Sequence, residues 1–145
     1  MVNDFADQPR NSAWMSGVAM LANACAGLGD VERSRTLYDL LAPFQDRNVL
    51  AADCACWGAA SHYLGMLAAT RGEYSLAQEH FEHALAMNER MGASPWVAHT
   101  CHQYALMLLD RSGPLDSDRA EELLGVLSRL PRNVGCTIWW DSPAR

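Results

Sequence analysis

The chain has 145 residues and no lysine, since all eleven basic residues are arginine. This absence excludes a lysine Schiff base, a lysine general base and a phosphate-binding loop that ends in Gly-Lys-Ser or Gly-Lys-Thr. The GxGxxG pattern of dinucleotide-binding loops and the HExxH pattern of zinc proteases are also missing. The usual forms of nucleotide chemistry are therefore not encoded, and we expect no cofactor.

Long apolar runs and an excess of positive charge are lacking too. No uninterrupted apolar run approaches the roughly 20 residues of a membrane span. Seventeen acidic residues against eleven basic ones give a net charge of −6, whereas a protein that binds a phosphate backbone needs a basic face. We therefore expect neither nucleic acid nor a membrane as a direct partner. The opening Met1-Val-Asn-Asp-Phe is unlike a signal peptide, which predicts a cytoplasmic protein with reduced cysteines.

The spacing of the cysteines gives no clear site. Cys54 and Cys56 are separated by one residue, whereas zinc and redox motifs separate their cysteines by two. Because both lie in an alanine-rich apolar run, we interpret them as small buried residues of a helix interface. A metal or redox role is the alternative.

Helix-forming residues dominate, and β-branched residues are scarce: Ile138 is the only isoleucine. Glycine and proline turn signals separate stretches with helical periodicity. Asp30 and Asp118 are candidate N-caps. Because the loops are short, we expect antiparallel hairpins at about residues 12–42, 50–91 and 95–129, then a tail, 130–145, in a single domain of residues 1–145. The six predicted helices span about residues 12–27, 31–42, 50–70, 74–91, 95–111 and 117–129.

The third and fourth predicted helices differ in their pattern. The stretch 50–70 is apolar almost all round, which predicts a helix packed between neighbours. The stretch 74–91 has a single apolar stripe that includes Ala77, Phe81 and Ala84. Its other side carries polar residues and is predicted to face away from the core; these are Gln78, Glu79, Glu82, Asn88 and Glu89.

Self-comparison reveals a repeat of about 40 residues. Leu64-Gly65 corresponds to Leu21-Ala22 at a shift of 43 residues and to Tyr104-Ala105 at a shift of 40. Residues 64–84 resemble the tetratricopeptide repeat, whose signature contains Leu-Gly and then Ala-x₃-Phe, here Ala77-x₃-Phe81. Ser61 and Ala68 stand where the signature has tryptophan and tyrosine. The units are longer than the usual length of about 34 residues of this repeat, and they contain the phrases Tyr38-Asp-Leu-Leu-Ala-Pro-Phe and Asn88-Glu-Arg-Met-Gly-Ala-Ser-Pro-Trp-Val-Ala-His-Thr. In both respects they are similar to the C-terminal repeat region of large bacterial regulators that join an ATPase to a cyclase or transcription-factor module.

This resemblance implies an all-α fold, a right-handed solenoid of three antiparallel helix hairpins. It also implies that a protein or peptide partner binds in a concave groove lined by the first helix of each hairpin. With Leu21, Leu64 and Tyr104 taken as buried anchors, helical geometry assigns residues to that groove. The predicted groove residues are Ser16, Asn23, His62, Met66, His99, His102, Leu106 and Asp110. Basic residues that could hold an acidic peptide terminus are missing from these positions.

The three histidines of this set leave two interpretations open. His62, His99 and His102 could ligate a metal or serve as acid and base near neutral pH. Equally, they could line a polar groove that hydrogen-bonds a peptide. His80 and His83, one turn apart on the fourth helix, are predicted to face solvent or the next hairpin.

The tail 130–145 carries two adjacent tryptophans, Trp139 and Trp140. Each can bury roughly 150–250 Å², so we expect them to cover the end of the last hairpin. The alternative is a patch for self-association, which would give a homodimer. Taken together, the sequence favours a scaffold or sensor module that binds a protein or peptide in bacterial signalling or transcriptional regulation, rather than an enzyme. The alternative is a small-molecule- or metal-binding protein or a small enzyme that uses the histidine-lined groove.

Overall fold

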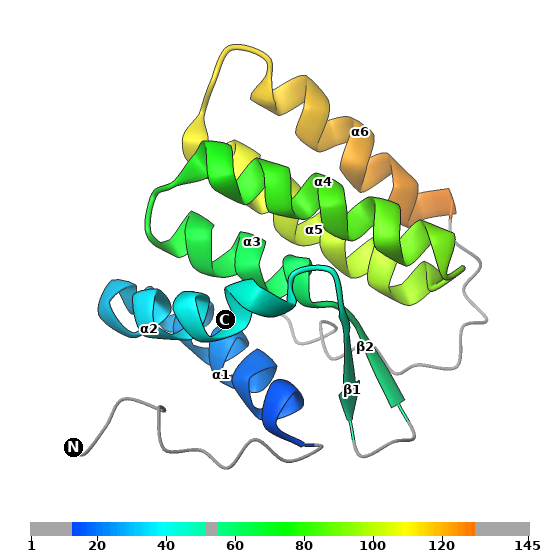
Figure 1. Cartoon of the computed structure of the whole chain (residues 1–145). Helices are drawn as coiled ribbons and strands as arrows, with labels where there is room; N and C mark the ends of the chain where they lie inside the picture. The colour runs from blue at the N-terminus through cyan, green and yellow to red at the C-terminus, as the bar shows by residue number, and fades with distance from the viewer. Residues whose placement is uncertain (1–12, 52–54, 130–145) are drawn as a thin grey trace.

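The structure is a computed structural model that describes residues 13–51 and 55–129, and most of these residues are helical (Figure 1). The prediction of a mainly α-helical chain with six helices is confirmed over these residues. The predicted cap at Asp30 is present, since its carboxylate accepts the Arg33 backbone N–H at 3.0 Å. The last helix begins at Asp116, two residues before the predicted cap Asp118. The helices are α1 (Trp14–Leu28), α2 (Val31–Leu41), α3 (Ala60–Thr70), α4 (Tyr74–Arg90), α5 (Ser94–Arg111) and α6 (Asp116–Arg129), and a short 3₁₀ turn (Ala42–Phe44) follows α2.

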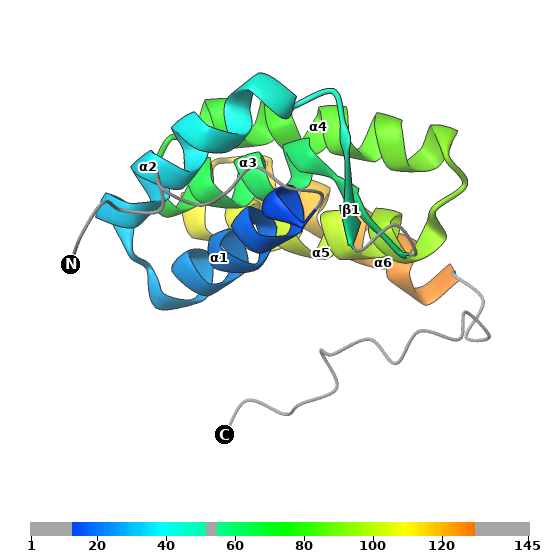
Figure 2. The same ribbon diagram turned by 60° about the horizontal axis from the view of Figure 1, so that its bottom comes forward.

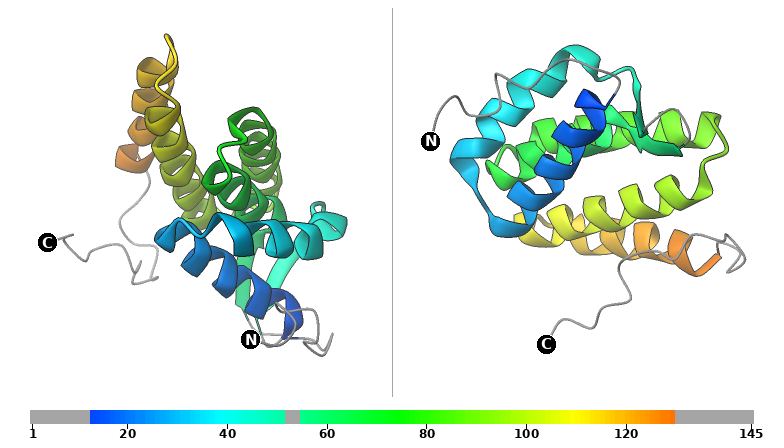
Figure 3. Two further views of the ribbon diagram at one scale, coloured as in Figure 1. Left: turned by 90° about the vertical axis from the view of Figure 1, so that its left-hand side faces the viewer. Right: turned by 90° about the horizontal axis from the view of Figure 1, so that it is seen from below.

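The helices pack as consecutive pairs, α1 with α2, α3 with α4 and α5 with α6 (Figure 3). Helix α3 contacts both α1 and α2, and α4 contacts α5, so the middle pair lies between the outer two. Helices α2 and α4 lie along one side of the molecule, and α1 and α5 lie along the other (Figure 2). This order brings α1, α3 and α5, which are far apart in the sequence, to one face.

The predicted helix 50–70 is wrong over residues 50–51 and 55–59, which belong to two paired β-strands. Strand β1 (Asn48–Ala51) pairs antiparallel with β2 (Ala55–Ala59). Gly58 ends this hairpin with φ +77°, a left-handed backbone that an α-helix does not allow. A Cβ at Gly58 would lie 2.7 Å from the Trp96 ring, whose indole N–H donates to the Cys56 carbonyl at 2.9 Å. These contacts with α5 outweigh the helix propensity of the alanine-rich run. They also leave Cys56 exposed, whereas the sequence predicted it to be buried.

Helix α3 forms the centre of the core, as its apolar sequence predicts. Every residue from Ala60 to Ala68 is buried. Leu64 and Leu67 have no exposed surface, and Gly65 allows the Phe81 ring of α4 to approach so closely that a Cβ there would lie 2.9 Å from it. Phe81 in turn stacks on Tyr104 of α5, with ring centroids 5.6 Å apart. The core therefore runs through α3 from the first helix pair to the last.

Helix α4 buries two polar residues that the sequence predicted to be outside the core. Asn88 is fully buried because β2 packs against this end of α4. His80 is buried against α2 of the preceding pair, where its Nε2 lies 2.7 Å from the Tyr38 hydroxyl oxygen. His83 is half-buried and lies 3.2 Å from the Asp46 carboxylate.

Two further sets of predictions concern membrane crossing and residues outside the described ranges. Among the described residues, none of the helices combines the length and apolar character that a membrane crossing requires. Cys54, Trp139 and Trp140 lie outside the described residues, so the predicted end cover and self-association patch stay predictions.

Candidate binding pocket on the face of α1, α3 and α5

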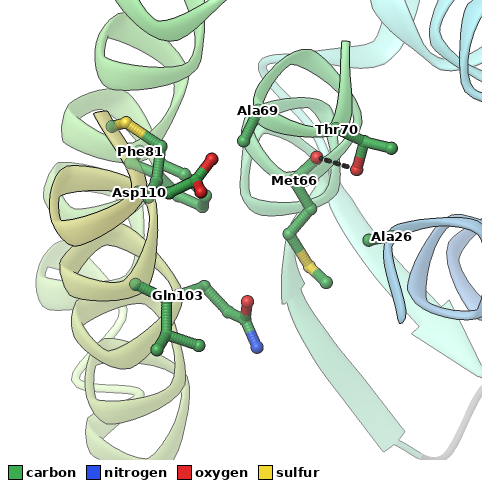
Figure 4. Close-up of a pocket in the computed structure, with 9 residues that line it drawn as sticks. Ala26, Met66, Ala69, Thr70, Phe81, Gln103 and Asp110 are labelled. Carbon is green, nitrogen blue, oxygen red and sulfur yellow. Dashed lines mark hydrogen bonds between the residues drawn. The ribbon is translucent and has the colours of Figure 1, made fainter. Parts of the chain in front are cut away.

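A pocket of about 200 Å³ opens on the face where α1, α3 and α5 meet (Figure 4). It brings together three of the predicted groove residues: Met66 from α3, and Leu106 and Asp110 from α5. The remaining lining residues are Ala26, Ala69, Thr70, Phe81, Gln103 and Met107.

Helical spacing explains why these side chains converge. On α3, Met66, Ala69 and Thr70 lie at positions i, i+3 and i+4, which share one helix face. On α5, Gln103, Leu106, Met107 and Asp110 follow the same spacing over two turns. Figure 4 shows Gln103 and Asp110 opposite the α3 residues. Ala26 of α1 and Phe81 of α4 complete the lining. Small residues on α1 and α3 keep the pocket open.

The pocket has an apolar interior and a few polar groups. Met66, Met107 and Phe81 provide polarisable, adaptable walls. The Thr70 hydroxyl donates to the Met66 carbonyl of its own helix at 2.9 Å. The Asp110 carboxylate accepts from the Tyr74 hydroxyl at 2.7 Å, and this hydrogen bond raises the pKa of Tyr74. Among the described residues that line the pocket, Asp110 alone is ionisable.

Two other predicted groove residues do not reach this pocket. Ser16 is buried in the first turn of α1, where its hydroxyl donates to the Ala13 carbonyl at 2.8 Å. Asn23 is exposed on α1, and its amide lies 3.4 Å from the Ala19 carbonyl. The predicted groove is therefore shorter at its α1 end than the helical geometry indicated.

The placement of His62 is the main correction to the predicted site. Its side chain is fully buried and does not face the groove. The rings of Tyr63, Trp96 and His99 surround it, and the His99 ring centroid is 4.9 Å away. His99 stacks on Trp96, which the β-hairpin holds in place. Side chains of α5, namely Trp96, His99 and Thr100, therefore enclose His62 in the core.

A buried hydrogen-bond network joins His62 to Asn88 and Thr100. The Thr100 hydroxyl donates to the Trp96 carbonyl at 2.7 Å and accepts from the Asn88 amide at 3.2 Å. A hydroxyl has one proton and two lone pairs, so the second lone pair accepts from His62 Nδ1 at 3.1 Å. We therefore assign the Nδ1–H tautomer to neutral His62. Its Nε2 is then a buried acceptor that has no hydrogen-bond partner in the described part of the chain.

Asn88 connects three elements, although it was predicted on the polar side of its helix. Its side-chain oxygen accepts the Ala59 backbone N–H at the end of β2 at 3.1 Å, while its amide donates to Thr100 of α5. The signal was present in the sequence, because Asn88 continues the apolar stripe of Phe81 and Ala84 at the spacing i, i+3, i+7.

Burial makes these histidines weak bases. It lowers the pKa of His62 well below the usual value, and the neighbouring His99 lowers it further. Burial also lowers the pKa of His99. Within residues 13–51 and 55–129, no group of three or more His, Cys, Asp or Glu side chains is placed to hold a metal ion. The predicted metal set of His62, His99 and His102 is therefore not assembled, because His62 faces the core.

No family model, curated protein or solved structure matches this chain. The geometry of the pocket and the pattern of the sequence are thus the basis for a functional proposal.

Proposed function

We propose that this chain is a partner-binding module of tetratricopeptide-like hairpins, and that the pocket between α1, α3 and α5 holds one apolar side chain of a protein or peptide. The pocket is the observation that supports this proposal. It lies on the first helices of the three pairs, and its walls are mainly apolar. Met66, Leu106 and Asp110, three of the residues that the resemblance and helical geometry assign to a concave groove, line it.

The size of the pocket favours an amino-acid side chain over a larger ligand. Pockets that bind drug-sized molecules usually have volumes of about 300–1,000 Å³, whereas this pocket has about 200 Å³. A buried apolar anchor in such a pocket supplies much of the affinity in many protein interfaces. The remaining contact area would come from the exposed surfaces of α1 and α5 around the pocket.

The proposed architecture is a right-handed solenoid of three hairpins, and the proposed setting is bacterial signalling or transcriptional regulation. The packing of the pairs in chain order supports the solenoid. The setting rests on the sequence resemblance of residues 64–84 and of the longer repeat units. In this role the chain is a scaffold or sensor that recognises its partner through the α1–α3–α5 face and performs no reaction.

The test is selection from a displayed library of random dodecapeptides on the immobilised chain, followed by fluorescence anisotropy with the most enriched peptide. Two leucines of α5 provide a matched pair of variants, because Leu106 and Leu109 are each 48% exposed but only Leu106 lines the pocket. We expect Leu106→Gln to weaken binding by roughly tenfold through loss of apolar burial. Leu109→Gln should change the Kd less than twofold.

Equal effects of the two leucine substitutions would contradict the proposal, and so would a library that yields no enriched peptide. Circular dichroism and gel-filtration elution of both variants control for folding. Because both changes are made at half-exposed positions of one helix, their effects on stability should be similar and small.

A further inference from the structure

The pocket combines its apolar walls with one carboxylate that no cation of the described chain neutralises. Asp110 lies in the last turn of α5 and accepts a hydrogen bond from the neutral Tyr74 hydroxyl at 2.7 Å. None of the ion pairs among residues 13–51 and 55–129 includes it. Its exposed position leaves the carboxylate accessible from solvent.

The two arginines nearest in sequence to the pocket-lining residues are engaged elsewhere. Arg111, next to Asp110, donates to both oxygens of Asp116 at 2.8 and 2.5 Å and to Gln78 at 3.0 Å. Arg71, next to Thr70, pairs with Glu73 at 2.6 Å and lies over the Tyr38 ring on α2. Neither guanidinium is thus turned toward the pocket carboxylate.

The position of Asp110 on its helix adds to the negative potential. Backbone carbonyls at the C-terminus of a helix carry partial negative charge and favour a nearby cation. Asp110 is the penultimate residue of α5, so its carboxylate and the helix end act in the same sense. The chain as a whole carries a net charge of −6, which also attracts a basic partner.

We propose that the partner segment presents an apolar side chain to the pocket and an adjacent arginine or lysine to Asp110. This inference rests on the proposed function and specifies the chemistry of the partner. The methionine walls adapt to leucine, methionine or phenylalanine as the apolar residue. The basic residue forms an ion pair at the rim of the pocket, where it determines which apolar segments bind.

A double-mutant cycle tests the ion pair. The enriched peptide from the dodecapeptide library is synthesised in two forms, one with its basic residue and one with neutral citrulline or norleucine in its place. Each form is titrated against the wild-type chain and against Asp110→Asn. Asp39→Asn is the matched control, because Asp39 is an exposed carboxylate on α2 and does not line the pocket.

We expect the neutral peptide to bind the wild-type chain about three- to fivefold more weakly, as for an exposed ion pair. The same replacement should change binding to Asp110→Asn less than 1.5-fold, while Asp39→Asn should behave as the wild type. The coupling should also decrease as salt is raised.

Three outcomes would overturn the inference in distinguishable ways. Enriched peptides that share an apolar residue without an adjacent basic residue would refute the proposed ion pair with Asp110 and leave the pocket proposal intact. An equal loss on the wild-type chain and on Asp110→Asn would assign the basic residue to another site. The absence of any peptide whose binding depends on Leu106 would refute both this inference and the proposed function.

Discussion

Removal of the Asn88 side chain should destabilise the fold more than any other single polar-to-alanine change among the residues described above. Asn88 has no exposed surface, and its amide group joins the end of β2 to α5 through Ala59 and Thr100. Asn88→Ala leaves the Ala59 N–H buried without its acceptor and removes the donor to the Thr100 hydroxyl. It also opens a cavity where the amide group was.

The magnitude follows from these losses. A buried donor that loses its acceptor costs about 1–3 kcal/mol, and the lost hydrogen bond to Thr100 costs about 1 kcal/mol. The small cavity adds about 1 kcal/mol. The expected loss of about 3–5 kcal/mol is a large part of the roughly 5–15 kcal/mol by which a typical domain is stable.

Urea denaturation followed by circular dichroism measures this loss. Asn23→Ala is the matched control, because Asn23 is exposed on α1 and makes only a long contact of 3.4 Å with its own helix. The control should change the free energy of unfolding by less than about 0.5 kcal/mol. A loss below about 1 kcal/mol for Asn88→Ala, at an unchanged slope against urea, would refute the network as described.

Two further predictions concern the buried histidines and the β-hairpin. The first is tested by lowering the pH, and the second by glycine-to-alanine substitutions. Burial lowers the pKa values of His62 and His99, so the unfolded chain takes up protons first as the pH falls below about 6.5. The free energy of unfolding should then decrease as the pH falls, by at most about 1.4 kcal/mol per pH unit for each histidine that stays neutral in the folded chain. Urea midpoints between pH 7.5 and 5 would detect this decrease, and a midpoint independent of pH would contradict it. Gly58→Ala should destabilise the chain by about 2–4 kcal/mol, because the left-handed backbone and the Trp96 ring both oppose a Cβ, whereas Gly27→Ala, in an open helical position, should be neutral or stabilising. Equal thermal midpoints of the two glycine variants would show that Trp96 does not hold the hairpin.

The helices could be predicted from the sequence because their signals are local. Apolar spacing and turn residues determine α4 and α5 to within a residue or two. The run 50–59 has no such local signal. Its small apolar residues are compatible with a buried helix or a strand, and the choice depends on Trp96, some 40 residues further along the chain.

Nonlocal contacts also explain which site residues were misplaced. Met66 and Leu106 line the pocket, and each lies on a helix face that the spacing of its own helix defines. Asn88 is covered by β2 and His62 by Trp96 and His99 of α5, and a helical pattern cannot predict which face another element covers. Asp110 was predicted as a groove residue from the spacing of its own helix. Its hydrogen bond with Tyr74 joins α5 to the start of α4, and the sequence pattern of neither helix predicts this contact.

The methyl groups of the seven methionines offer the most direct test of the binding pocket. Met66 and Met107 line it, whereas Met20 and Met91, which are 60% and 39% exposed, do not. In a methyl-labelled sample titrated with the most enriched library peptide, we expect the Met66 and Met107 resonances to shift with the binding curve while those of Met20 and Met91 stay in place. Shifts confined to Met20 or Met91, with Met66 and Met107 unchanged, would contradict the assignment of the pocket between α1, α3 and α5 as the binding site.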